Sequence, residues 1–350
     1  HVSEVGSPLA RYALLERHPP QWRTQRFDDD PRAGWVGQLV GELATQVMRH
    51  INGAAAVTPV SLVALTLLAT PRRAMSIGDL ERQVEFYLAL LREAPYGPRV
   101  TVTALSATEV IAYCESMQVL QRQAHKLGDV ARMSDEGAVL MTYYRNNIVH
   151  LFALPSLIAC AFIGNAQVSA EDIQRLAWRI YPYVAAELFL KWTEEELPAA
   201  VDAMLQALAR AGLLEPVDGG RAWRRPPPTS PRAVQLSLLA QSTIQTIERY
   251  YLAIALLIQS GSGTITAKGL VERCHVMAQR VAMLYGFDSP EFSDRALFDH
   301  FIGLLVGRGV IRAGEGGRLS FDEVLERVAA DAEFVLSEQI RHSILQVTHA

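Results

Sequence analysis

The chain has 350 residues, half of them hydrophobic, and carries a formal net charge of −4 with an isoelectric point near 6.2. This composition excludes an intrinsically disordered chain, and the slightly acidic balance excludes a global basic field that would draw it to nucleic acid. A chain of this length buries a large core, arranged as two or three domains or as a row of smaller modules.

The first 35 residues combine a strand-like start with turns. The stretch "HVSEVGSPL" predicts a short strand ending at Gly6 and Pro8, and the prolines and aspartates after it predict turns. A helix is expected from about Trp35 to Ile51. The start shows no signal-peptide pattern, and it lacks an initiating methionine, so we expect a piece of a longer protein.

Four capping signals predict helix starts further along the chain. In each, a Ser or Thr oxygen accepts a hydrogen bond from a free amide of the first turn, and an acid three residues later favours the positive end of the helix dipole. The pairs are Ser76 with Asp79, Ser106 with Glu109, Ser169 with Asp172, and Thr193 with Glu196.

One apolar stretch, Ile148 to Ile163, raises the question of membrane insertion. It is shorter than the roughly 18 to 20 residues that span a bilayer, and it contains a histidine and a proline. We interpret it as a buried helix, and membrane association remains open.

The chain contains an internal repeat. "ARAGLLEPVDGGRAW" ends at Trp223 and "VGRGVIRAGEGGRLS" ends at Ser320, and their glycines and arginine align at an offset of 97 residues. The same offset relates "VSAEDIQRL" to "ITAKGLVER". An ungapped register over some hundred residues indicates a duplication. Each copy predicts three helices and a β-hairpin whose paired glycines supply the positive φ angles of a tight turn.

The repeat predicts a mostly α-helical fold of repeated modules with short β-hairpin wings, similar to the winged-helix arrangement. The expected divisions are 1–35, the end of an upstream domain and a linker; 36–140, a helical module that is a weak first copy; 141–228 and 236–350, two helix-hairpin modules, the last with a C-terminal helix. The proline-rich stretch Arg221 to Arg232 reads as a linker.

Winged-helix modules are best known from DNA binding, which requires a basic recognition helix and basic wings. The third helices here, "ELPAAVDAMLQALARAG" and "RALFDHFIGLLVGRG", are apolar and lightly charged. We therefore expect these helices to pack against one another or to contact protein, and we do not favour binding of nucleic acid.

The sequence contains no nucleotide-binding, zinc or nucleophile motif, and no metal or cofactor is expected. No histidine is followed five positions later by an aspartate, so the HxxxxD arrangement of an acyltransferase base is absent. The three cysteines, Cys114, Cys160 and Cys274, lie in separate apolar stretches and are expected to be buried free thiols. The Gly-rich "SGSGT" at 260–264 is expected to be a turn.

Polar residues gather at the start of the apolar stretch, in "MTYYRNNIVHLFALP". At 100° per residue on a helix, Tyr143, Asn146, Asn147 and His150 share one face and Arg145 lies opposite. Either the stripe bonds to a neighbouring loop or helix end, or it faces a polar ligand or a catalytic domain. Arg145 likewise forms a salt bridge or contacts a phosphate.

A second group of candidates is basic. Arg221, Arg224, Arg225 and Arg232 surround the proline-rich stretch and are expected to contact a lipid or another anion.

Several separated motifs resemble one family in order. "INGAAAVTPVSLVALTLLA", "AVLMTYYRNNIVHLFALPSLIA", "YPYVAAELFLKW" and "VAMLYGFDSPEFSDRALF" look like the C-terminal half of bacterial membrane-bound glycerol-3-phosphate acyltransferase. The leading "VSEVGSPL" is similar to the strand that closes the family's α/β acyltransferase domain. The resemblance covers almost the whole chain.

The resemblance implies an enzyme that transfers an acyl group from acyl-CoA or acyl carrier protein to the sn-1 hydroxyl of glycerol 3-phosphate. Lysophosphatidic acid is the product, made for phospholipid synthesis at the cytoplasmic face of the inner membrane. The family's catalytic motifs precede the segment matched here, so no catalytic residue is assigned to this chain and we expect this segment alone to be inactive. The alternative is a winged-helix-like scaffold or regulatory module that binds protein or nucleic acid.

Overall fold

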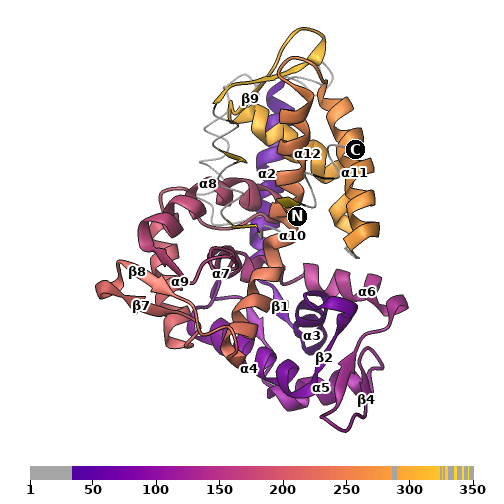
Figure 1. Ribbon diagram of the computed structural model, residues 1–350, viewed down its shortest axis with the longest axis vertical. Coiled ribbons are helices and arrows are strands. Elements are labelled where there is room, and N and C mark those ends of the chain that lie inside the picture. The colour runs from indigo at the N-terminus through magenta and orange to yellow at the C-terminus, as the bar shows by residue number, and fades with distance from the viewer. Residues whose placement is uncertain are drawn as a thin grey trace, which may run out of the picture.

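The computed structural model describes residues 34–285 and 290–323, with the further positions 325, 328, 329, 335, 336, 341, 342 and 346. The strand and turns expected before residue 34 and most of the expected C-terminal helix lie outside the described residues. In the described part, helices predominate and strands are short (Figure 1). The prediction of a mostly α-helical protein is confirmed.

Regular structure alternates between long helices and strands of two or three residues. The α-helices of the described part are α2 (Gly34–Asn52), α3 (Pro59–Leu68), α4 (Ile77–Glu93), α5 (Ala107–Ser116), α6 (Asp135–Asn146), α7 (Val149–Cys160), α8 (Ala170–Leu188), α9 (Leu197–Arg210), α10 (Pro231–Ser260), α11 (Ala267–Tyr285) and α12 (Arg295–Gly307). Its strands are β1 (Ala56–Val57), β2 (Ala74–Ser76), β3 (Thr101–Val102), β4 (Gln121–Gln123), β5 (Val130–Arg132), β6 (Gln167–Ser169), β7 (Glu215–Val217), β8 (Ala222–Arg224), β9 (Ile311–Ala313) and β10 (Leu319–Phe321). Short 3₁₀ turns are η3 (Pro71–Arg73), η4 (Asp218–Gly220), η5 (Pro290–Ser293) and η6 (Glu315–Gly317).

One order of elements recurs: a strand, two main helices and an antiparallel strand pair. The first two occurrences form three-stranded antiparallel sheets of order β2-β5-β4 and β6-β8-β7, so the first strand pairs with the last. In the third occurrence β9 pairs with β10, and an antiparallel bridge joins Thr266 to Arg318. The 97-residue offset carries α8 onto α11, η4 onto η6 and β8 onto β10 with identical bounds. Gly219, Gly220, Gly316 and Gly317 all have positive φ, as tight turns require.

The core is centred on the packing of α7 against α10. All twelve residues of α7 are buried, which confirms the buried helix expected within 148–163. The Ser156 hydroxyl donates to the carbonyl of Ala240 at 3.1 Å and lies 2.8 Å from the hydroxyl of Thr243, so its polar group is satisfied inside the core. Burial of each large apolar side chain on such a helix contributes about 1.5–3 kcal/mol.

Local capping chemistry sets several helix starts as the sequence predicts. The hydroxyls of Ser76, Ser106 and Ser169 each accept from the amide three residues later, and Ser106 forms a complete capping box with Glu109. Thr193 and Glu196 exchange the same two hydrogen bonds, but α9 begins only at Leu197, so this pair organises the turn before the helix.

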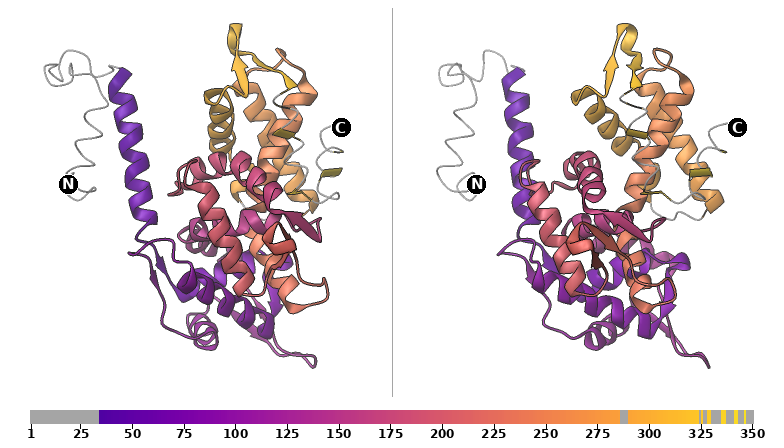
Figure 2. Two further views of the ribbon diagram at one scale, coloured as in Figure 1. Left: turned by 90° about the vertical axis from the view of Figure 1, so that its left-hand side faces the viewer. Right: turned by 60° about the vertical axis from the view of Figure 1, so that its left-hand side comes forward.

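Two connections position the rest of the molecule. Helix α2 confirms the helix expected at Trp35 to Ile51, and it stands to one side of the body (Figure 2). The stretch expected to be a linker, Arg221 to Arg232, is instead partly strand, because Ala222–Arg224 pairs within the sheet as β8, and α10 begins at Pro231. Helix α10 then runs through the molecule to the third repeat unit (Figure 1).

Candidate functional site

The polar stretch at the start of α7 does not lie on one continuous helix. Helix α6 ends at Asn146, and Ile148, with φ −128° and ψ −8°, interrupts the helix before α7 begins at Val149. The expectation of one polar face is therefore wrong in its geometry, since the break turns the residues on either side of Ile148 in different directions. Arg145 and Asn146, expected on opposite faces, both contact Glu291.

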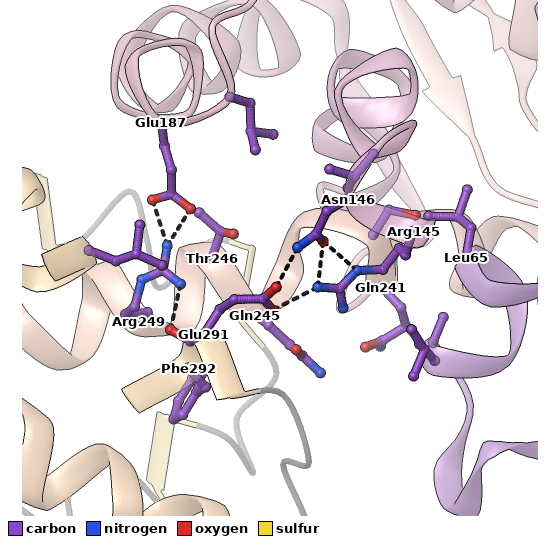
Figure 3. A pocket seen from close by; sticks show the side chains of 16 residues that line it. Leu65, Arg145, Asn146, Glu187, Gln241, Gln245, Thr246, Arg249, Glu291 and Phe292 are labelled. Atoms are coloured by element: carbon purple, nitrogen blue, oxygen red, sulfur yellow. Dashed lines mark hydrogen bonds and ion pairs between the residues drawn. The ribbon is translucent and has the colours of Figure 1, made fainter. Parts of the chain in front are cut away.

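A cavity of about 250 Å³ lies beside this break (Figure 3). Residues of α3, α6, α7, α8, α10, η5 and α12 enclose it, so it is the meeting point of segments distant in the sequence. Its lining residues are Leu65, Leu68, Ala69, Arg145, Asn146, Val149, Glu187, Leu188, Gln241, Ser242, Gln245, Thr246, Arg249, Glu291, Phe292 and Leu297.

The first polar cluster of the cavity joins the end of α6 to η5. Nη2 of Arg145 lies 2.7 Å from Oε2 of Glu291, and Nδ2 of Asn146 donates to Oε1 of the same carboxylate at 2.6 Å. Arg145 also donates from Nε and Nη2 to the amide oxygen of Asn146, at 3.1 and 2.9 Å. The Arg145 side chain is only 16% exposed, so this salt bridge is shielded more than a surface pair. Arg145 thus takes the salt-bridge alternative here.

The second cluster joins α8, α10 and η5. Nη2 of Arg249 donates to both oxygens of Glu187 at 2.5 Å, and Nη1 donates to the backbone carbonyl of Glu291 at 3.1 Å. The hydroxyl of Tyr250 donates to Oε2 of Glu187 at 2.9 Å. The side chains of Arg249 and Glu187 are 4% and 10% exposed, so the charges are compensated by each other rather than by solvent.

The cavity is lined by polar side chains that bind one another. Its lining contains neither histidine, lysine nor cysteine, and its charged side chains are paired. The described residues hold no group of three or more His, Cys, Asp or Glu side chains placed to bind a metal ion. One lining hydroxyl, that of Ser242, is buried with no hydrogen-bond partner among the described residues. The cavity can therefore hold helices in register and accept a small polar group.

The remaining residues of the predicted stripe lie apart from this cavity. Tyr143 is 67% exposed and its ring meets Tyr144 edge-on, with centroids 6.3 Å apart. Asn147 is exposed at the C-cap of α6. Both are accessible to a partner surface.

His150 belongs to a different, buried cluster. Its Nε2 lies 3.0 Å from the carbonyl of Asn52, and its ring meets Tyr96 edge-on with centroids 5.3 Å apart. Burial lowers the pKa of His150 to about 4, and the hydrogen bond to Asn52 opposes that shift. Asn52 in turn donates to the carbonyls of Leu188 and Phe189, so the cluster links the end of α2 to the end of α8.

The predicted basic group is divided. Arg224, Arg225 and Arg232 line one pocket, whereas Arg221 lies outside it and donates from Nε to the carbonyl of Asp218 at 3.2 Å.

Sequence reasoning missed the residues that complete the cavity: Glu187, Arg249 and Glu291. The available signal is the presence of charges inside apolar helical stretches, such as "ERYYLAIALL", because a charge there is buried and needs a partner. The three buried free thiols are confirmed, and 261–264 is a turn between α10 and α11. Among the described residues, no helix combines the length and the apolar character needed to cross a bilayer.

Comparison with known proteins gives one consistent result. Residues 4–314 match the family model of the glycerol-3-phosphate acyltransferase C-terminal region. The chain is 44% identical over 343 residues to a glycerol-3-phosphate acyltransferase of Pseudomonas aeruginosa (strain UCBPP-PA14), covering 98% of this chain and 41% of that protein. It is 42% identical to the protein of the same name from Pseudomonas fluorescens (strain Pf-5), with the same coverage. The chain thus spans about two fifths of the length of the relatives it matches. It belongs to the glycerol-3-phosphate acyltransferase family, and it matches the C-terminal region of that family.

Proposed function

We propose that this chain is the helical C-terminal region of a glycerol-3-phosphate 1-O-acyltransferase. The complete protein would transfer an acyl group from acyl-CoA or acyl carrier protein to the sn-1 hydroxyl of glycerol 3-phosphate, which yields lysophosphatidic acid for phospholipid synthesis. The observation that carries this proposal is the match of 98% of the chain to 41% of named acyltransferases.

The role we assign to this region is to support a catalytic domain that contains the HxxxxD base. No histidine of the chain has an aspartate five positions later, and the cavity beside α6 offers no general base of the histidine type. Arg145, Asn146 and Glu291 fix the end of α6, and this supports use of the neighbouring exposed Tyr143 and Asn147 as a contact surface for the catalytic domain.

The repeat units are proposed to be winged-helix-like modules used for protein contact. The sheet orders β2-β5-β4 and β6-β8-β7 support this reading. Helix α9, which would occupy the recognition position, buries Leu197, Val201, Met204, Leu205, Ala207 and Leu208 and has Arg210 as its one basic residue. A DNA-reading helix needs a basic, exposed face, so packing and protein contact suit α9 better.

We further propose peripheral association of the complete protein with the cytoplasmic face of the bacterial inner membrane. The substrates and product support it, because an acyl chain and a lysophospholipid partition into a bilayer.

A domain exchange tests the proposal. The C-terminal region of the Pseudomonas aeruginosa acyltransferase is replaced by this chain, and transfer of radiolabelled palmitoyl groups from palmitoyl-CoA to glycerol 3-phosphate is measured. We expect the chimera to be active and the isolated chain to be inactive. Turnover by the isolated chain at the rate of the whole relative would overturn the supporting role, and an inactive but folded chimera would overturn the assignment to this enzyme.

A further inference from the structure

A second pocket, of about 810 Å³, lies where the β7–β8 hairpin meets the start of α10. It is separate from the cavity beside α6, with which it shares no lining residue. Its lining residues are Ala166, Ala209, Gly212, Leu214, Glu215, Pro216, Arg224, Arg225, Pro226, Pro227, Pro228, Ser230 and Arg232.

Three arginines and one glutamate carry the charge of this pocket, so it is electropositive. Nη1 of Arg224 is 3.8 Å from Oε2 of Glu215, and both side chains are well exposed, at 49% and 70%. Such a long, solvated pair compensates little of the arginine charge. Nε of Arg225 is buried and has no hydrogen-bond partner among the described residues. Nη2 of Arg224 also donates to Oε1 of Gln167 at 3.4 Å. Because an arginine side chain offers five N–H donors, other donors of the three guanidinium groups can still reach a ligand.

The position of Arg232 depends on a glycine. Gly212 has φ +71°, and a Cβ built on it would lie 1.6 Å from Nη1 of Arg232. The guanidinium therefore occupies space that only glycine leaves open, and Nη1 donates to the carbonyl of Gly212 at 3.2 Å. Residue 212 in this way fixes the third arginine on the wall of the pocket.

The internal repeat shows that the fold itself does not require these arginines. At the 97-residue offset, Arg224, Arg225 and Arg232 correspond to Phe321, Asp322 and Ala329. Gly212 corresponds to Gly309, which has the same φ of +71° but has no heavy atom of the described residues within 4 Å of the position of its Cβ. The third copy thus builds the same hairpin with other residues at these three positions, so the hairpin itself does not need the arginines, and this points to a ligand rather than to folding as the reason for the charges.

The start of α10 adds to the positive electrostatic potential of the pocket. The helix has 30 residues, and Ser230, its N-cap, lines the pocket and accepts from the amide of Ala233 at 3.2 Å. The positive end of the helix dipole therefore lies beside the three guanidinium groups.

We propose that this pocket binds a phosphate group, carried either by the headgroup of an anionic phospholipid or by a soluble phosphate ester. Planar guanidinium groups bind phosphate oxygens in pairs of parallel hydrogen bonds, and Arg225 and Arg232 are the principal ligands. The inference goes beyond acyl transfer, and its test needs no enzymatic activity.

The experiment uses the 350-residue chain and two probes. Pyrophosphate binding is measured by isothermal titration calorimetry, and co-sedimentation is measured with phosphatidylcholine vesicles with and without phosphatidylglycerol. Arg225→Gln and Arg232→Gln are expected to weaken binding about tenfold or more, because each removes a charge-assisted contact. Arg221→Gln is the matched control, since it removes one positive charge from the same hairpin outside the pocket.

A second pair of variants keeps the net charge constant. Gly212→Ala displaces the Arg232 guanidinium and is expected to weaken binding, whereas Gly309→Ala carries the same backbone strain and leaves binding unchanged. Circular dichroism checks that each variant is folded.

The outcomes separate the two sources of phosphate. Pyrophosphate binding that depends on Arg225 and Arg232 supports a soluble ester, and binding of phosphatidylglycerol vesicles alone with the same dependence supports a lipid headgroup. Binding of neither probe overturns the proposal. Equal weakening by Arg221→Gln and Arg225→Gln also overturns it, because general charge attraction would then explain the binding.

Discussion

Both carboxylate oxygens of Glu187 lie 2.5 Å from a single nitrogen of Arg249, in a part of the molecule where the two side chains are 10% and 4% exposed. Glu187 belongs to α8 and Arg249 to α10, and the same guanidinium reaches the carbonyl of Glu291 in η5. This arginine therefore ties together three segments that the sequence separates by 62 and 42 positions.

Loss of Arg249 is expected to be one of the costly single changes in the chain. Arg249→Met leaves the Glu187 carboxylate buried without its cation, and we expect the free energy of unfolding to fall by about 3–5 kcal/mol in urea titrations followed by circular dichroism. Arg295→Met is the control, because Arg295 pairs with Glu272 where the side chains are 53% and 58% exposed, and such pairs contribute about 0–1 kcal/mol. Adding Glu187→Gln to Arg249→Met should recover part of the loss. Equal effects of the two single variants would contradict the role assigned to Arg249.

Two adjacent asparagines give a second matched comparison. Both are exposed at the end of α6, and Asn146 donates to the Glu291 carboxylate at 2.6 Å. We expect Asn146→Ala to lower the free energy of unfolding by about 1 kcal/mol, since a hydrogen bond to a charged acceptor is lost, and Asn147→Ala to lie within about 0.5 kcal/mol of the parent chain.

The same two variants, made in a complete acyltransferase that contains this region, address the proposed contact surface. Asn147→Ala should reduce acyl transfer without reducing stability if the exposed end of α6 contacts the catalytic domain. Full activity of a folded Asn147→Ala enzyme would remove this residue from the contact surface.

The sequence predicts what is local and repeated. Capping serines fix helix starts because each accepts a hydrogen bond from the amide three residues later in the chain. The glycine pairs at 219–220 and 316–317 indicate the hairpin turns. The apolar character of 148–163 on every side predicts burial, and the structure has α7 in the core. Each of these signals depends on neighbours within a few positions, so single-sequence reasoning can use them.

The candidate site could not be predicted in the same way because its partners are distant. Glu291 binds Arg145 and Asn146, which are about 145 positions away in the sequence, and no local sequence pattern predicts such a contact. The break at Ile148 is equally hidden, since the sequence there continues a helical pattern whereas Ile148 has φ −128° and ψ −8°. As a result, His150 was expected beside Asn146, whereas it lies in the cluster of Asn52 and Tyr96.

Protonation of His150 is expected to destabilise the fold. Burial lowers its pKa from 6.5 to about 4, so the folded state holds the neutral imidazole in the range where the unfolded chain takes up a proton. The contribution of neutral His150 to the free energy of unfolding is fully present above pH 6.5. It is lost as the pH falls towards 4, by at most about 1.4 kcal/mol per pH unit. In chemical denaturation between pH 7 and 4.5, His150→Gln should show a shallower decline than the parent chain. His125→Gln, at an exposed position, serves as the control, and an unchanged pH dependence in His150→Gln would refute the assignment.

Glu248 produces the opposite pH dependence. It is 4% exposed in the middle of α10, its Oε2 has no hydrogen-bond partner among the described residues, and burial raises its pKa from 4.5 to about 8. The folded state therefore keeps the carboxyl protonated where the unfolded chain has released the proton, so its contribution is present below pH 4.5 and is lost as the pH rises to 8. Glu248→Gln resembles the protonated acid in shape and cannot ionise, so we expect it to raise the melting temperature at pH 8 and to change it little at pH 4.5. Glu85→Gln on the exposed face of α4 should leave the pH dependence unaltered, and a Glu248→Gln chain that melts like the parent at pH 8 would show that Glu248 carries no such ionisation penalty.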